Sequence, residues 1–418
     1  MRTRAIAALL AVMAVLAGCS DDGVAPSLTY DRPPRDELTP GFVGAPTLPP
    51  PDMTNDGPGS LVSVEPYTDA NIEGANATAV KVVYRSTSGV DGAATEVSGV
   101  VAVPPGMPPK GGWPILSFAH SLIGVTPKCA PSMAEGLWGY SQTTATLVGR
   151  GFVVALPDYQ GLGTPGGGRH SIVDAATLGN NVIDAARAAR RVLPSASTRW
   201  AAFGIGEGGL AAWAAAERAG IYGGGMDLVG SVALAPYADL SPMVDTATSG
   251  QFAGPQQIQM YIQVLQSLEN ADPRFDLDAQ RSASARQQWN VLTDCAPKDP
   301  QQAQQALTQL KPEDVRPQSP AAVADARQRL ADAALPARYP TPGSAPVFVV
   351  FGTADTSTPA LGIQQALASA CAKGDRIEVN KRAGDTEVTN DQIIQSAIAW
   401  MFARFDGQRL GNVCVGAT

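Results

Sequence analysis

Apolar runs rich in β-branched residues alternate with segments of helical periodicity along most of the chain. We expect two antiparallel strands first, at 80–84 and 97–103. Buried strands should follow at 114–118, 152–156, 201–203, 228–234 and 347–351, with helices at 175–192, 209–219, 360–372 and 391–405. Alternating strands and helices joined by right-handed crossovers predict an α/β fold with a doubly wound, mostly parallel sheet.

This alternation stops between Leu234 and Val347. The stretch is rich in Gln, Ala and Asp, and residues 256–269 carry apolar side chains at helical spacing. We expect a helical cap or lid at 237–345 over the carboxyl ends of the strands, where α/β sheets bind ligands. The alternative is a second packing layer without a ligand. The α/β core would then comprise 61–236 and 346–418.

The N-terminus has the pattern of an export signal. Arg2 and Arg4 precede Ala5–Ala17, an apolar run that is too short to span a bilayer. It ends in Leu-Ala-Gly-Cys19, which resembles the lipobox of bacterial lipoproteins and implies a signal peptide at 1–18 and a lipidated Cys19. The alternative is an ordinary cleaved signal with a chance cysteine. Residues 19–60, rich in Pro, Asp, Gly and Thr, are predicted to tether the protein to the outer face of the bacterial membrane.

Composition narrows the possible partners. The formal net charge is −8, from 30 basic and 38 acidic residues, which argues against a nucleic-acid partner. The four cysteines after Cys19 predict two disulfides in an exported chain, and three pairings are possible. The chain has no Cys-x-x-Cys or His-x-x-His spacing, so a metal site is disfavoured, and no cofactor is predicted. The oligomeric state cannot be predicted.

Gly204-Ile205-Gly206-Glu207-Gly208 is the most informative segment. It follows a short apolar strand and opens an Ala-rich stretch, which is the setting of the nucleophile elbow Gly-x-Ser-x-Gly of α/β-hydrolases. The middle residue here is Gly206, which has no oxygen that can attack an ester. The segment therefore predicts an elbow without its nucleophile.

From about Gly59 onward, the chain resembles the secretory lipase family of α/β-hydrolases, the group of the lipase A-like enzymes. The motifs that carry the resemblance are Tyr84-Arg-Ser-Thr, Asp158-Tyr-Gln-Gly-Leu-Gly-Thr164, Asp184-Ala-Ala-Arg-Ala-Ala-Arg190, Val232-Ala-Leu-Ala-Pro236, Phe351-Gly-Thr-Ala-Asp355 and Ala399-Trp-Met-Phe-Ala-Arg-Phe405. The resemblance implies an α/β-hydrolase fold and hydrolysis of lipid esters by a Ser-Asp-His triad. It also favours the pairings Cys129–Cys295 and Cys371–Cys414.

The family's triad is incomplete in this chain. Asp355 matches the triad acid, although an aspartate in this position can also cap a turn or the helix that follows. Gly206 stands at the nucleophile position, and Asp385 stands where the family has its histidine. A serine hydroxyl is a weak nucleophile until a histidine accepts its proton, so losing both residues predicts loss of acyl transfer.

The two histidines of the chain, His120 and His170, both precede Asp355 and so depart from the family's order. His120 and Ser121 lie in the loop expected to shape the oxyanion hole, where Ser121 as a substitute nucleophile is the weaker alternative. Glu207, Asp355 and Asp385 are expected to meet near one cleft without a histidine to balance them. Lys381 or Arg382, or a bound cation or polar ligand, would then neutralise these carboxylates.

Three functions remain open. The favoured one is a secretory-lipase-like surface lipoprotein that has lost catalysis, a pseudoenzyme, and binds a lipid or acyl ligand. The first alternative is an active triacylglycerol lipase or carboxylesterase, acting in lipid catabolism through a non-standard nucleophile. The second is a structural or partner-binding envelope protein. Activity against acyl esters would separate the first alternative from the other two.

Overall fold

The computed structural model describes residues 45–164, 168–336, 345–410 and 414. Within these residues the chain forms a nine-stranded sheet of order β1-β2-β3-β5-β4-β6-β7-β8-β9. The strands are β1 (Leu61–Tyr67), β2 (Thr78–Thr87), β3 (Ala94–Val103), β4 (Ile115–Ala119), β5 (Val153–Pro157), β6 (Arg199–Ile205), β7 (Asp227–Leu234), β8 (Val347–Gly352) and β9 (Ile377–Arg382). The pairs from β1 to β5 along the sheet are antiparallel, and those from β5 to β9 are parallel. The predicted α/β-hydrolase architecture is confirmed.

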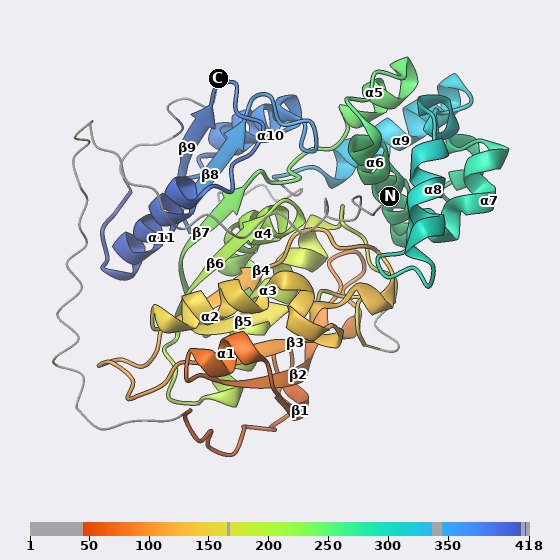
Figure 1. Cartoon of the computed structure of the whole chain (residues 1–418). Helices are drawn as coiled ribbons and strands as arrows, with labels where there is room; N and C mark the ends of the chain where they lie inside the picture. The colour runs from red at the N-terminus through yellow and green to blue at the C-terminus, as the bar shows by residue number, and fades with distance from the viewer. Residues whose placement is uncertain (1–44, 165–167, 337–344, 411–413, 415–418) are drawn as a thin grey trace, which may run out of the picture. The chain divides into compact units, whose positions relative to one another are not determined.

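Helices cover both faces of the sheet (Figure 1). On one face, α3 (Ala175–Val192), α4 (Glu207–Tyr222) and α10 (Ala360–Lys373) share a buried apolar cluster with the sheet. On the other face, α1 (Ala70–Gly74), α2 (Ser141–Gly149) and α11 (Asp391–Phe405) share a second cluster. Neighbouring residues of β4 divide between these clusters, Ile115 in the first and Leu116 in the second, because side chains alternate across a strand.

Residues 237–345, the segment predicted to be a cap, contain five α-helices in their described part. These are α5 (Met243–Ser249), α6 (Pro255–Ala271), α7 (Ala283–Leu292), α8 (Pro300–Gln309) and α9 (Pro320–Ala333). They build an apolar cluster of their own, which also takes in Val125, Ile172 and Val173 from loops of the core. Asn270 of α6 donates a hydrogen bond to the backbone oxygen of His170 at 2.7 Å. The helices are therefore tied to loops that follow β4 and β5.

Both predicted disulfides are present. Cys129 pairs with Cys295, with their Cα atoms 5.8 Å apart, and Cys371 pairs with Cys414 at 5.9 Å. The first bond links the loop after β4 to the helical segment and closes 166 residues, so the chain-entropy model assigns it about 5 kcal/mol. Among the described residues, no helix combines the length and apolarity that a membrane crossing requires.

The described part of the segment predicted to be a tether contacts the core. Thr78 donates its hydroxyl to the backbone oxygen of Pro46 at 2.6 Å, and the N–H of Asp52 donates to the backbone oxygen of Arg191 at 2.8 Å. The guanidinium of Arg191 binds the carboxylates of Asp52 and Asp56. Residues 46–56 are therefore attached to β2 and to the C-terminal turn of α3. The predicted signal peptide and Cys19 lie outside the described residues.

Candidate functional site

The strand-turn-helix of a nucleophile elbow is present. β6 ends at Ile205, Gly206 has φ 60° and ψ −115°, and α4 begins at Glu207. Glycine reaches this left-handed region without the steric cost that a side chain would add. A Cβ atom on Gly204 would collide with the backbone of Gly208, and one on Gly208 would collide with the backbone of Ala119. The spacing of glycines therefore correctly predicted the sharp turn.

The space that a nucleophilic side chain would need is filled. A Cβ atom on Gly206 would lie 2.8 Å from Oγ of Ser121 and 3.2 Å from two ring carbons of Tyr237. Tyr237 follows β7, and its N–H donates to the backbone oxygen of Gly206 at 3.1 Å, which holds its ring beside the elbow. Neither Tyr237 nor the closure of the elbow was found by sequence reasoning.

The backbone N–H that was expected to be an oxyanion donor has a hydrogen-bond partner. In α/β-hydrolases this donor is a backbone N–H of the loop after the strand that corresponds to β4. Here the N–H of Ser121 donates to the hydroxyl of Tyr140 at 3.0 Å. Burial raises the pKa of Tyr140 to about 12, with a smaller contribution from the charge of Glu207. The hydroxyl is therefore neutral at pH 7 and accepts the hydrogen bond of this N–H.

Tyr140 is placed by a short left-handed segment. Gly136, Leu137 and Trp138 have φ values of 66°, 53° and 56°, which is rare for residues with side chains. Each such residue costs about 1–2 kcal/mol, so packing has to compensate for it. The side chain of Leu137 is fully buried, and the ring of Tyr140 packs edge-on against Phe118 with centroids 5.7 Å apart.

Glu207 has a histidine partner, contrary to the expectation of three unbalanced carboxylates. Nε2 of His170 lies 2.7 Å from Oε1 of Glu207, and the two side chains are 1% and 0% exposed. The other ring nitrogen of His170 lies 3.1 Å from the backbone oxygen of Gln160. The pair joins the first residue of α4 to the loop after β5. These residues are 37 positions apart (207 − 170), and no local pattern in the sequence signals their contact.

His120 is also buried, but it does not serve Ser121 as a base. Its Nδ1 lies 2.7 Å from the backbone oxygen of Ser121, and its Nε2 lies 3.4 Å from the backbone oxygen of Asp158. Burial lowers the pKa of His120, while the charge of Glu207 acts in the opposite direction. A neutral imidazole in this position donates from Nδ1 to a carbonyl. The geometry therefore offers no support for Ser121 as a substitute nucleophile.

Asp355 lies in the turn after β8, at the sheet edge where β6 ends. Its Oδ1 accepts hydrogen bonds from the N–H of Ser357 at 2.8 Å, from the Ser357 hydroxyl at 2.6 Å and from the N–H of Thr358 at 3.1 Å. This is the turn-capping role that the sequence left open. The hydroxyl of Thr358 reaches the backbone oxygen of Ala235 beyond β7 at 3.4 Å, which places the turn beside the neighbouring strand.

Asp385 follows β9 at the same edge. Its carboxylate lies 2.8 Å from Nε of Arg382, and its backbone oxygen accepts from the N–H of Ala354 at 3.1 Å. The loops that carry Asp355 and Asp385 are therefore neighbours, as the family's acid and histidine positions require. Arg382, one of the two candidates, neutralises Asp385. Within the described ranges, no group of three or more His, Cys, Asp or Glu side chains is arranged to hold a metal ion.

Comparison with known proteins agrees with this geometry. The profile of the family described as secretory lipase matches residues 141–412. A Mycobacterium tuberculosis protein named "probable inactive lipase" is 31% identical over 175 residues, which is 39% of this chain and 38% of that protein. The chain thus matches well under half the length of this relative.

Two solved structures show the same fold. Lipase A of Candida antarctica, in its closed state, has a TM-score of 0.67 at 16% identity, covering 88% of this chain and 86% of that one. A rice cell wall degrading esterase of Xanthomonas oryzae has a TM-score of 0.62 at 19% identity, covering 84% and 99%.

Proposed function

This chain belongs to the secretory lipase family, and we propose that it is a member that binds an acyl ester without hydrolysing it. The observation that carries the proposal is the closed elbow at Gly206. The nucleophile is absent, and Ser121 and Tyr237 occupy the space beside it. Asp385, at the position of the base, is paired with Arg382, so the imidazole that accepts the serine proton in a triad is missing.

Binding of a carbonyl group follows from the backbone that remains. The N–H of Ser121 faces the Tyr140 hydroxyl, and Glu207 supplies one of the first N–H groups of α4, which have no acceptor inside a helix. A carbonyl oxygen that displaces the Tyr140 hydroxyl receives the N–H of Ser121 in its place. The buried carboxylate of Glu207 disfavours a fatty-acid anion there, so the ligand is a neutral ester.

The place of action is the cell envelope. Family membership indicates export, and the lipobox-like Leu-Ala-Gly-Cys19 supports acylation at Cys19. Cys19→Ala should release the protein from the membrane fraction or block its processing. Retention in the membrane with a cleaved signal would count against the lipid anchor while leaving the ester site untouched.

Loss of hydrolysis is tested with the purified protein on p-nitrophenyl butyrate and p-nitrophenyl palmitate, together with a fluorophosphonate probe. We expect no turnover above background and no covalent label, because no activated hydroxyl is present at the elbow. An active secretory lipase should be assayed in parallel as the positive control. Stoichiometric labelling of this chain, at Ser121 or elsewhere, would refute the proposal.

Ester binding is tested with Tyr140→Phe, which frees the N–H of Ser121 and keeps the ring. A net hydrogen bond contributes about 0.5–1.5 kcal/mol, so this variant should bind a long-chain fluorescent ester roughly two- to tenfold more tightly. Tyr67→Phe is the matched control, since the Tyr67 hydroxyl donates to the backbone oxygen of Ala134 instead. Equal affinity in wild type and Tyr140→Phe would contradict a carbonyl site at Ser121.

A further inference from the structure

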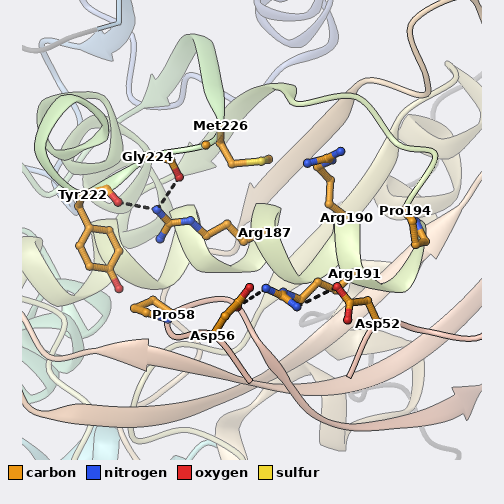
Figure 2. Close-up of a pocket in the computed structure, with 11 residues that line it drawn as sticks. Asp52, Asp56, Pro58, Arg187, Arg190, Arg191, Pro194, Tyr222, Gly224 and Met226 are labelled. Carbon is orange, nitrogen blue, oxygen red and sulfur yellow. Dashed lines mark hydrogen bonds and ion pairs between the residues drawn. The ribbon is translucent and has the colours of Figure 1, made fainter. Parts of the chain in front are cut away.

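A second candidate site lies away from the elbow, at the C-terminal ends of α3 and α4. A pocket of about 500 Å³ opens there between these helices and the N-terminal segment (Figure 2). Its walls include three arginines from the C-terminal part of α3, namely Arg187, Arg190 and Arg191, and the loop Gly224-Gly225 after α4. Three cations on one face of one helix repel each other unless each has a partner.

Two of the three guanidinium groups have their partners within the protein. Arg187 lies 2.7 Å from a carboxylate oxygen of Asp184 and donates to the backbone oxygens of Tyr222 at 2.6 Å and Gly224 at 3.0 Å. Arg191 binds Asp52 and Asp56, as described above. Figure 2 shows these contacts as dashed lines. Both side chains therefore build the walls of the pocket.

Arg190 differs from its neighbours. Its Nε donates to the backbone oxygen of Ala196 at 3.2 Å, which fixes the direction of the side chain. Across the part of the chain that the structure describes, no carboxylate lies within ion-pair distance of Arg190, and its two terminal amino groups have no hydrogen-bond acceptor. In Figure 2 no dashed line joins Arg190 to another residue that is drawn. Arg190 thus brings an uncompensated positive charge to the pocket.

The glycine loop adds a second, independent observation. Gly225 has φ 84° and so needs to be glycine, but Gly224 has no such backbone requirement. A Cβ atom on Gly224 would meet no atom within 4 Å, so packing does not require glycine there either. Considering only described residues, the N–H of Gly224 has no acceptor. The N–H of Gly225 points away from Arg187, because the oxygen of the same peptide accepts from Arg187. A glycine with a free N–H is what close approach of a ligand to the backbone requires.

We propose that this pocket binds a phosphate group through Arg190 and the backbone N–H of Gly224. Arginine and backbone N–H groups are the donors that phosphate oxygens favour. A single small phosphate fits better than an extended anionic surface, because the chain carries a net charge of −8 and Asp52 and Asp56 stand at the pocket. This site is independent of the elbow and of the proposed ester binding.

The test uses the purified full chain in isothermal titration at matched ionic strength. The probes are inorganic phosphate and dihexanoyl phosphatidylglycerol below its micellar concentration, which separate a free phosphate from a lipid headgroup. Arg190→Gln should weaken binding about tenfold or more, because hydrogen bonds to a charged guanidinium are lost. Arg409→Gln, which removes the same charge at an exposed position near the C-terminus, should leave binding unchanged.

Gly224→Ala is the second variant, since its added methyl group meets open space and should leave the unfolding midpoint in chloride unchanged. Weaker binding in both Arg190→Gln and Gly224→Ala supports the site. Binding of either probe alone also supports it and identifies the source of the phosphate. Absence of saturable binding to both probes, or wild-type affinity in Arg190→Gln, overturns the proposal.

Discussion

Restoring a serine at the elbow should destabilise the protein, and the structure gives the size of the effect. Gly206→Ser places a side chain at φ 60° and puts its Cβ 2.8 Å from Oγ of Ser121 and 3.2 Å from the ring of Tyr237. A non-glycine residue in a sparsely populated backbone region costs about 1–3 kcal/mol. Overpacking of a filled site adds about 1–3 kcal/mol. We therefore expect the free energy of unfolding to fall by about 2–6 kcal/mol.

Two further variants separate the backbone cost from the crowding. Gly92→Ser has a comparable φ of 73°, but its Cβ would meet nothing within 4 Å, so it measures the cost of a positive φ alone. Ser121→Gly removes the nearest obstructing atom and should recover about 1 kcal/mol or more in the Gly206→Ser background. Urea denaturation followed by tryptophan fluorescence measures wild type, Gly206→Ser, Ser121→Gly, the double variant of these two and Gly92→Ser. Equal losses for Gly206→Ser and Gly92→Ser, with no coupling to Ser121, would show that the elbow is open and refute the reasoning.

Three other predictions follow from the buried charges and the triad positions. His170→Leu leaves the buried Glu207 side chain without its partner, so it should destabilise by about 3–5 kcal/mol, whereas adding Glu207→Gln should recover part of that loss in the same denaturation assay. Burial raises the pKa of Asp184 to about 6 from an ordinary 3.8, so its folded state binds the proton more tightly. The stability of wild type relative to Asp184→Asn should therefore fall as the pH rises from about 4 to 6, and a flat difference would contradict this. Gly206→Ser with Asp385→His should yield weak esterase activity only when Ser121→Gly is also present, and activity in the double variant alone would show that crowding is unimportant.

The sheet was predictable where its strands are buried on both faces, because such strands appear as continuous apolar runs. β1 and β9 were missed for the opposite reason. They are the edge strands, and most of their side chains are only partly buried, with Glu378, Asn380 and Lys381 interrupting the apolar pattern of β9. Their pairing depends on β2 and β8, which the local sequence of an edge strand does not reveal.

The candidate site, too, could be predicted from local sequence only in part. The turn at Gly206 was predictable, since the spacing of glycines reports a close approach between a strand and a helix. The hydroxyl of Tyr140 on Ser121, the ring of Tyr237 beside Gly206 and the pairing of His170 with Glu207 were not. Each contact joins loops that follow different strands, so only the assembled sheet brings them together.

The elbow glycines have a consequence for how such a chain changes over time. Gly204 and Gly208 are held by backbone atoms of α4 and of β4, so any side chain there would separate a strand from its helix. A side chain at position 206 would not separate the strand from the helix in this way. Glycine at 206 also relieves a strained backbone conformation. A mutation at position 206 can therefore remove the reactive side chain of such an elbow, while Gly204 and Gly208 are retained because the fold requires them. The flanking glycines of an elbow motif therefore indicate the fold, and only the residue between them indicates whether a nucleophile is present.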